Sequence, residues 1–190
     1  GCMNHLIAAC LALGVATACA RPAAAPVAPA AETGCEAEAS AEWPGAQGRR
    51  FTATVKTEGP TCPQAVALLV VRDAGGDVFW TDALPSARVM GLNEAATPAA
   101  MSAALAEWAG LPARHAQTTA DLSPWSKTSG QPGESEFPFH PEAWMGEEAF
   151  ARIAAEAAPM FCYVQGMESL SCLIERDGRL EKIGVQSFPG

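Results

Sequence analysis

The sequence predicts an α+β fold, with about seven strands in one or more antiparallel sheets and two helices between two blocks of strands. Three observations support this order. Apolar and polar residues alternate over 51–56, as they do in a half-buried strand. Residues 97–110 and 146–159 each combine a helix start, a helix stop and an apolar stripe. Turn residues then divide 160–187 into three shorter runs that suit strands.

The first block is predicted to contain four strands. Residues 35–43 alternate small and acidic side chains, which suits an edge strand, and 49–57 alternate apolar and polar ones. Residues 65–73 are apolar through their centre and suit a central strand. The glycines of 74–76 then turn the chain into 77–82, so that a hairpin forms. The core-facing residues of the second strand are expected to be Phe51, Ala53 and Val55.

The first helix is predicted from its end signals. Thr97 is a suitable N-cap, Pro98 suits the first helical position, and Gly110 is expected just past the last turn. The apolar face should contain Met101, Leu105 and Trp108.

The second helix is predicted to begin at Glu147 and Glu148, whose charges favour a helix N-terminus, and to end before Pro159. Its apolar stripe is expected to contain Phe150, Ile153 and Ala157. Between the two helices, residues 111–146 are rich in Pro, Ser and Gly and are expected to form a long loop.

The last block is predicted to begin with a hairpin whose tip is near Met167. This register pairs Val164 with Leu170 and Cys162 with Cys172. A two-residue turn at Asp177-Gly178 then leads into a last strand, which should place Ile183 opposite Cys172 and Val185 opposite Leu170. Both helices are expected on one face of a single antiparallel sheet, and two separate small sheets are the alternative.

The chain has 190 residues, a hydrophobic fraction of 49% and a net charge of −9. This length suits one domain, predicted over 35–190. An acidic surface repels nucleic acid and anionic lipid headgroups, so neither is an expected partner.

An uncharged apolar run over 6–20 has the length of a secretory signal and is too short to span a bilayer. Within it, Val15–Cys19 (VATAC) resembles the lipobox of bacterial lipoproteins. The resemblance implies a signal over 1–20, lipidation of Cys19 and anchoring in the outer membrane on the periplasmic side. Residues 21–34, rich in Pro and Ala, would then be a tether. Ordinary cleavage, which would give a soluble periplasmic or secreted protein, is the alternative.

Cysteine number agrees with export. Of seven cysteines, Cys2 and Cys10 would leave with the signal and Cys19 would carry the lipid. The remaining even number predicts two disulfides. The hairpin register pairs Cys162 with Cys172, which leaves Cys35 for Cys62. No C-x-x-C pair is present, so neither a zinc site nor another metal or cofactor is predicted.

The sequence contains no G-x-S-x-G, P-loop or G-x-G-x-x-G motif. His115 and His140 both fall in the 111–146 loop, where they could meet Glu134, Glu136 or Glu142. A hydrolase or metal-dependent enzyme using this loop is therefore one alternative function.

The clamped hairpin is the preferred contact surface. Its outer face and tip are expected to present Tyr163, Gln165, Met167 and Glu168, and a disulfide would reduce the entropy that this tip loses on binding. The predicted function is a non-enzymatic binding or inhibitor module of the cell envelope, with an envelope protein or cell-wall component as its partner. A purely structural envelope protein is the third alternative.

Overall fold

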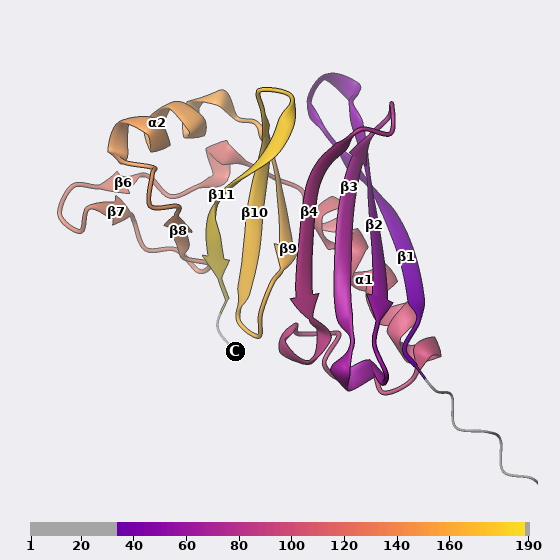
Figure 1. The fold of residues 1–190 in the computed structure, drawn as a ribbon. Helices are drawn as coiled ribbons and strands as arrows, with labels where there is room; N and C mark the ends of the chain where they lie inside the picture. Colours follow the sequence, from indigo (N-terminus) through magenta and orange to yellow (C-terminus); the bar gives the residue numbers. More distant parts are fainter. Residues whose placement is uncertain (1–33, 189–190) are drawn as a thin grey trace, which may run out of the picture. The chain divides into compact units, whose positions relative to one another are not determined.

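The computed structural model describes residues 34–188 (Figure 1). The predicted signal segment, Cys19 and nearly all of the predicted tether lie outside the described residues. The described part has an α+β fold with antiparallel strands, as the sequence predicts. It contains no helix that is both long enough and apolar enough to cross a membrane.

The first sheet is a four-stranded antiparallel meander, ordered β1-β2-β3-β4. Its strands are β1 (Ala37–Pro44), β2 (Arg50–Glu58), β3 (Val66–Asp73) and β4 (Val78–Pro85). The predicted edge position of the first strand and central position of the third are confirmed. Phe51, Ala53 and Val55 are fully buried, so the predicted alternation of β2 is also confirmed.

The second sheet contains five strands in the order β5-β9-β10-β11-β8. They are β5 (Gln117–Thr118), β8 (Phe139–Pro141), β9 (Pro159–Val164), β10 (Ser169–Arg176) and β11 (Arg179–Ser187). A further pair joins β6 (Trp125–Ser126) to β7 (Gln131–Pro132). The segment predicted as one long loop therefore contains four short strands, and the strands form separate sheets rather than one.

Single 3₁₀ turns complete the secondary structure. They are η1 (Ala46–Gly48), η2 (Cys62–Gln64), η3 (Ser86–Arg88) and η4 (Thr119–Asp121). The turn η2 carries Cys62 to Cys35, just before β1, where the two cysteines form a disulfide with their Cα atoms 4.8 Å apart. This predicted bond joins the start of β1 to the connection that follows β2.

Helix α1 (Pro98–Arg114) begins as predicted, because the Thr97 hydroxyl accepts a hydrogen bond from the Ala100 amide at 3.2 Å. Its predicted end is wrong: the helix continues through Gly110 and Pro112. A proline inside a helix loses one backbone hydrogen bond. Here Pro112 is buried, and the carbonyl of Ala109, three residues earlier, accepts a hydrogen bond from the Trp43 indole at 2.8 Å. Packing against β1 thus stabilises the extra turn.

Helix α2 (Glu147–Glu156) ends with Ala157 in a left-handed conformation. Phe150 and Ile153 are buried as predicted, whereas Ala157 is exposed, so this member of the predicted stripe is wrong. The expectation that both helices cover one sheet face is also wrong. Helix α1 packs against β1 and β9, and α2 packs against η4 and β6.

The C-terminal hairpin has the predicted register between β9 and β10, with Cys162 opposite Cys172 and Val164 opposite Leu170. The two cysteines form the predicted disulfide, with Cα atoms 4.1 Å apart.

The predicted register of β11 is wrong after its midpoint. A bulge at Ile183 makes Cys172 face Gly184 and Leu170 face Gln186, instead of Ile183 and Val185. The strand comes very close to β8 here: a Cβ atom added to Gly184 would lie 2.5 Å from the His140 carbonyl oxygen. Glycine therefore permits both the bulge and the approach of β8.

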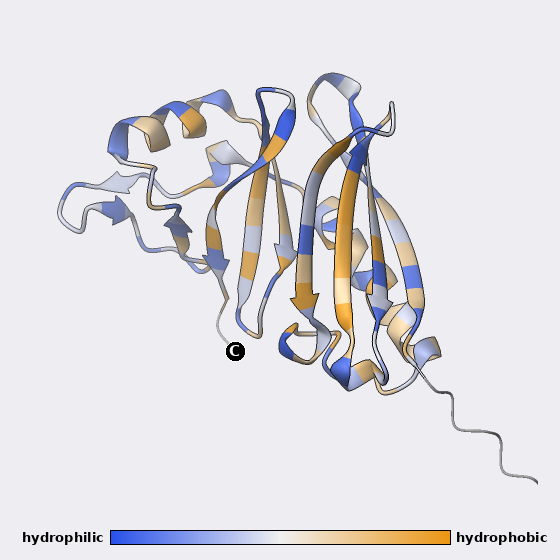
Figure 2. Ribbon diagram, in the orientation of Figure 1, coloured by the Kyte–Doolittle hydropathy of each residue, from blue (hydrophilic) through white to orange (hydrophobic). Residues whose placement is uncertain are grey.

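Two hydrophobic cores follow from this arrangement. The first lies between sheet one, α1 and one face of β9–β10, where the Trp43 and Phe161 rings stack 5.4 Å apart. The second lies on the opposite face of the C-terminal sheet and contains Phe150 and Ile153 of α2. Figure 2 shows that β3 is hydrophobic along most of its length, although Leu68 points to solvent and is 38% exposed.

Candidate functional site

A groove opens on the C-terminal sheet, on the face that also carries the second core. Its cavity volume is about 620 Å³. Its apolar lining contains Met90, Leu111, Phe137, Val164, Leu170 and Phe188. These residues come from six segments of the chain, so the groove exists only once the fold has formed.

Strand register places the floor of the groove. Val164, Leu170 and Gln186 are aligned across β9, β10 and β11, so their side chains share one face of the sheet. Cys162 of the hairpin disulfide also lines the floor. The disulfide thus joins two adjacent strands directly beneath the groove.

Two other segments form the walls. Leu111 and His115 come from the last turn and C-cap of α1. The loop after η3 is tied to the hairpin tip because the Met90 amide donates a hydrogen bond to the Gly166 carbonyl at 3.1 Å. The tip is tied to the C-terminal end of β11 in the same way, by the Phe188 amide and the Glu168 carbonyl at 3.2 Å.

The polar groups of the groove are few. The Gln117 side-chain amide donates a hydrogen bond to the Gln186 side-chain oxygen at a long 3.4 Å. This contact links β5 to β11 across the intervening strands. His115 is the one lining side chain that can carry a charge, although the whole chain has a net charge of −9. The groove is thus a neutral surface on an acidic protein.

Large exposed apolar side chains gather at the groove. Met90 is 41% exposed and Phe137 is 44% exposed, and both line the cavity. Met167 is 48% exposed and follows the tip glycine that Met90 binds. Grouped apolar exposure of this kind is typical of a contact site rather than of ordinary surface.

The predicted tip residues divide into two groups. Met167 and Glu168 are exposed at the tip, beside the groove. Gln165 is half-buried, and its side-chain oxygen accepts a hydrogen bond from the Lys182 ammonium at 3.4 Å. The tip therefore borders the groove without forming its floor.

Tyr163 is not on the outer face, so its predicted place is wrong. Its side chain is fully buried between the sheets. The hydroxyl donates to the Asp82 carboxylate at 2.6 Å and accepts from the Trp80 indole at 3.1 Å. Burial, and then the hydrogen bond to Asp82, raise the pKa of Tyr163 well above its usual range. This residue holds β4 to β9 and does not face a partner.

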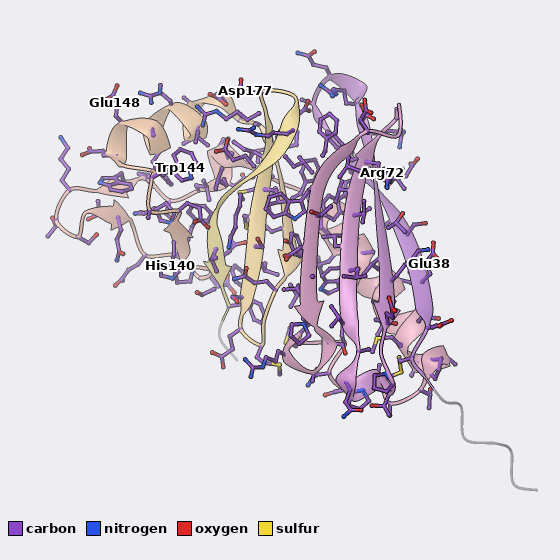
Figure 3. All side chains as sticks on the ribbon, in the orientation of Figure 1. Glu38, Arg72, His140, Trp144, Glu148 and Asp177 are labelled. Carbon is purple, nitrogen blue, oxygen red and sulfur yellow. A yellow bond between two sulfur atoms is a disulfide. The ribbon has the colours of Figure 1, made fainter. Side chains whose placement is uncertain are left out.

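The histidines predicted for an enzymatic loop lie on different elements. His115 caps α1 and lines the groove, whereas His140 is exposed on β8 opposite Val185 (Figure 3). Of the nearby carboxylates, Glu142 forms an ion pair with Lys182 at 3.4 Å. Within residues 34–188, no group of three or more His, Cys, Asp or Glu side chains is arranged to hold a metal ion.

Sequence reasoning missed most of the groove. Met90, Phe137 and Phe188 lie in loop or terminal segments, and no periodicity of apolar residues marks them. Gln186 was missed because the predicted register placed Val185, rather than Gln186, opposite Leu170. The glycine at 184, inside an otherwise regular strand pattern, is the signal that would have indicated the bulge.

The groove offers apolar surface, two amides and one imidazole. This set suits burial of an apolar group together with hydrogen bonding to a neutral one. No protein-family model, curated protein or solved structure matches the chain. Its functional assignment therefore depends on the geometry of the groove.

Proposed function

We propose that this chain is a non-enzymatic binding module of the cell envelope, which binds the apolar part of a neutral envelope component in the groove. The observation that carries the proposal is a cavity of about 620 Å³ with an apolar lining and exposed Met90 and Phe137 at its edge. Cavities of about 300–1,000 Å³ are the usual size of small-ligand sites. The absence of lining carboxylates and ammonium groups favours a neutral ligand.

The rigidity of the site supports binding. The Cys162–Cys172 bond joins the strands beneath the floor, and backbone hydrogen bonds hold the tip to the loop at Met90 and to Phe188. Binding to a preformed site loses less conformational entropy than binding to a mobile one. The two backbone hydrogen bonds join segments that are far apart in the sequence, and the disulfide fixes the hairpin to which both are made.

Two features support export and tethering. The two disulfides suit an oxidising compartment. The apolar run at 6–20, with its lipobox-like Val15–Cys19, supplies the secretory signal and the lipid attachment at Cys19. On this proposal the protein is anchored to the outer membrane on the periplasmic side, and the groove faces components of the envelope.

A neutral fluorescent probe tests the groove. N-phenyl-1-naphthylamine should bind the exported protein with increased fluorescence, and Phe137→Ser should weaken its binding by about tenfold, because an aromatic contact at the mouth is lost. Trp144→Ser is the matched control, since Trp144 is 48% exposed but lies outside the groove lining, beside the Arg176 guanidinium (Figure 3). Equal probe binding by both variants would rule out the groove as the site.

A second experiment tests the tether. Cys19→Ser should move the protein from the membrane fraction to the soluble fraction, because it removes the atom to which the acyl chains are attached. Cell fractionation followed by immunoblotting measures this distribution. If the variant stays with the membranes, Cys19 is not the anchor, and the binding proposal for the groove is unaffected.

A further inference from the structure

We propose that the ligand of the groove is a single unbranched alkyl or acyl chain with a neutral head that both donates and accepts hydrogen bonds. This inference rests on the proposed function and deepens it, because it specifies the ligand class of the same site. Four observations carry it: the charge of the lining, the use of the nearby backbone groups, the glutamine pair and the length of the floor.

The lining selects against a charged ligand. No carboxylate, ammonium or guanidinium group lines the cavity, and His115 is the one lining side chain that can be charged. A charged head buried here would lose its hydration without gaining a partner of opposite sign. The net charge of −9 on the whole chain adds long-range repulsion against anionic heads.

The backbone around the groove selects against a peptide. Each peptide residue brings one donor and one acceptor that need partners when buried. On β9, Pro159 and Met160 already pair with β5, and the Val164 carbonyl accepts a hydrogen bond from the Trp108 indole at 2.8 Å. These β9 groups are therefore not available to an extended peptide backbone, whereas a hydrocarbon chain requires no such partners.

The glutamine pair forms a place for a neutral head. One hydrogen bond, from the Gln117 amide nitrogen to the Gln186 side-chain oxygen, joins the two side chains at 3.4 Å. Each amide has two donors and a carbonyl oxygen with two lone pairs, so donor and acceptor capacity remains on this pair. Gln186 is nevertheless buried, with 9% of its surface exposed. A hydroxyl or amide head would satisfy this capacity at little desolvation penalty.

The floor extends along the strands. Gln117 is aligned with Met160, and Val164, which shares a row with Gln186, lies four residues further along β9. At about 3.3 Å per residue this length is about 13 Å, which suits a linear chain. Met90, whose unbranched side chain adapts to ligands of different shape, borders the groove.

A chain-length series tests the inference on the exported Cys19→Ser protein, which carries no acyl anchor of its own. Displacement of N-phenyl-1-naphthylamine by 1-octanol, 1-decanol and 1-dodecanol should strengthen by about fourfold per added methylene group. Dodecanoate at pH 8 should bind at least about tenfold more weakly than 1-dodecanol, because its carboxylate has no partner in the lining.

The head site has its own variant. Gln117→Leu with Gln186→Leu should weaken 1-dodecanol binding about fivefold, because the hydroxyl head loses its hydrogen-bond partners. Urea unfolding followed by tryptophan fluorescence shows whether this variant is still folded.

Three results would overturn the inference. They are alkanol affinity that does not depend on chain length, dodecanoate that binds as tightly as 1-dodecanol, and stronger displacement by a neutral leucine-rich hexapeptide than by any alkanol. In each case, probe binding that still depends on Phe137 would leave the proposed function standing. Loss of that dependence would instead remove the proposed function itself.

Discussion

The two faces of the C-terminal sheet differ in what covers them. On one face Phe161, Tyr163 and Leu173 are buried against the first sheet and α1. On the other face α2 covers only part of the strands, and the groove opens beside Val164 and Leu170. Successive residues of the same strand therefore have different roles. The first face, called the closed face below, stabilises the fold. The second, called the open face, is only partly covered and is free to bind a ligand.

The polar contacts of the two faces differ in the same way. On the closed face the Tyr163 hydroxyl has a short bond to Asp82 and a second partner in Trp80. On the open face Gln117 and Gln186 share one long contact. A satisfied buried network fixes one arrangement of the core, whereas partly used amides leave capacity for a ligand.

The largest effect is expected on the closed face. Phe161→Ala should lower the free energy of unfolding by about 3–5 kcal/mol, because it leaves a cavity between Trp43 and Phe51. Leu170→Ala, at a half-buried position on the open face, should lower it by about 1 kcal/mol. Urea unfolding followed by tryptophan fluorescence measures both. Equal losses would contradict the difference between the two faces.

The hairpin disulfide should have the next largest effect. Replacing Cys162 and Cys172 together by Ala should lower the free energy of unfolding by about 3 kcal/mol, the value expected for constraining a short loop in the unfolded chain. The same measurement on the Cys35→Ala, Cys62→Ala variant gives the stability contributed by the other disulfide, for comparison. A free thiol at any of these four positions in the purified protein, found by mass spectrometry, would contradict the pairing of that cysteine.

Tyr163→Phe should have a smaller effect. It removes the hydroxyl that joins Asp82 to Trp80, and it should lower the free energy of unfolding at pH 7 by about 1–3 kcal/mol. A Trp80→Phe variant removes the second contact alone and should lower it less. A loss below about 0.5 kcal/mol would mean that the network does not stabilise the closed face.

The same residue predicts a pH dependence. Its pKa is raised in the folded protein, whereas the unfolded chain ionises near the usual value of about 10. The stabilisation is therefore complete below about pH 10 and is lost as pH rises toward the folded pKa, by up to about 1.4 kcal/mol per pH unit. Tyr163→Phe should remove this part of the loss. Because the chain has one tyrosine, ultraviolet titration follows it directly, and ionisation near pH 10 in the folded protein would contradict the prediction.

The smallest effect is expected at the mouth of the groove. Phe137→Ser should change the free energy of unfolding by no more than about 0.5 kcal/mol, because the ring is 44% exposed. The same substitution should weaken probe binding, so stability and binding would separate at one position. A loss of several kcal/mol, measured by urea unfolding, would place Phe137 in the core instead.

The elements that local pattern determines were predictable from the sequence. Alternation at Phe51, Ala53 and Val55 identified a core-facing strand, and Thr97 marked a helix start. The symmetric placing of Cys162 and Cys172 about the hairpin tip gave the register and both disulfides. Each of these inferences depends on residues that are close in sequence or directly paired.

The remaining errors depend on long-range packing. Tyr163 was assigned to an outer face because the hairpin was treated as buried on one side, yet the continuous apolar run around it is typical of a strand buried on both. The bulge before Gly184 lies where β8 approaches β11, and the last turns of α1 contact Trp43 of β1. The groove could not be predicted from the sequence for the same reason, because its lining combines segments that lie between residues 90 and 188.

The Cys35–Cys62 bond has a mechanical consequence. The edge strand β1 pairs with β2 from Ala37 onward, so a pull on the chain at Gly34 would act at the end where the ladder could be peeled apart. The disulfide lies ahead of that first strand pair. Tension applied at the N-terminal side is therefore carried by a covalent link before the ladder is loaded. If the proposed tether is loaded, the disulfide would keep β1 in place at forces that otherwise peel away an edge strand.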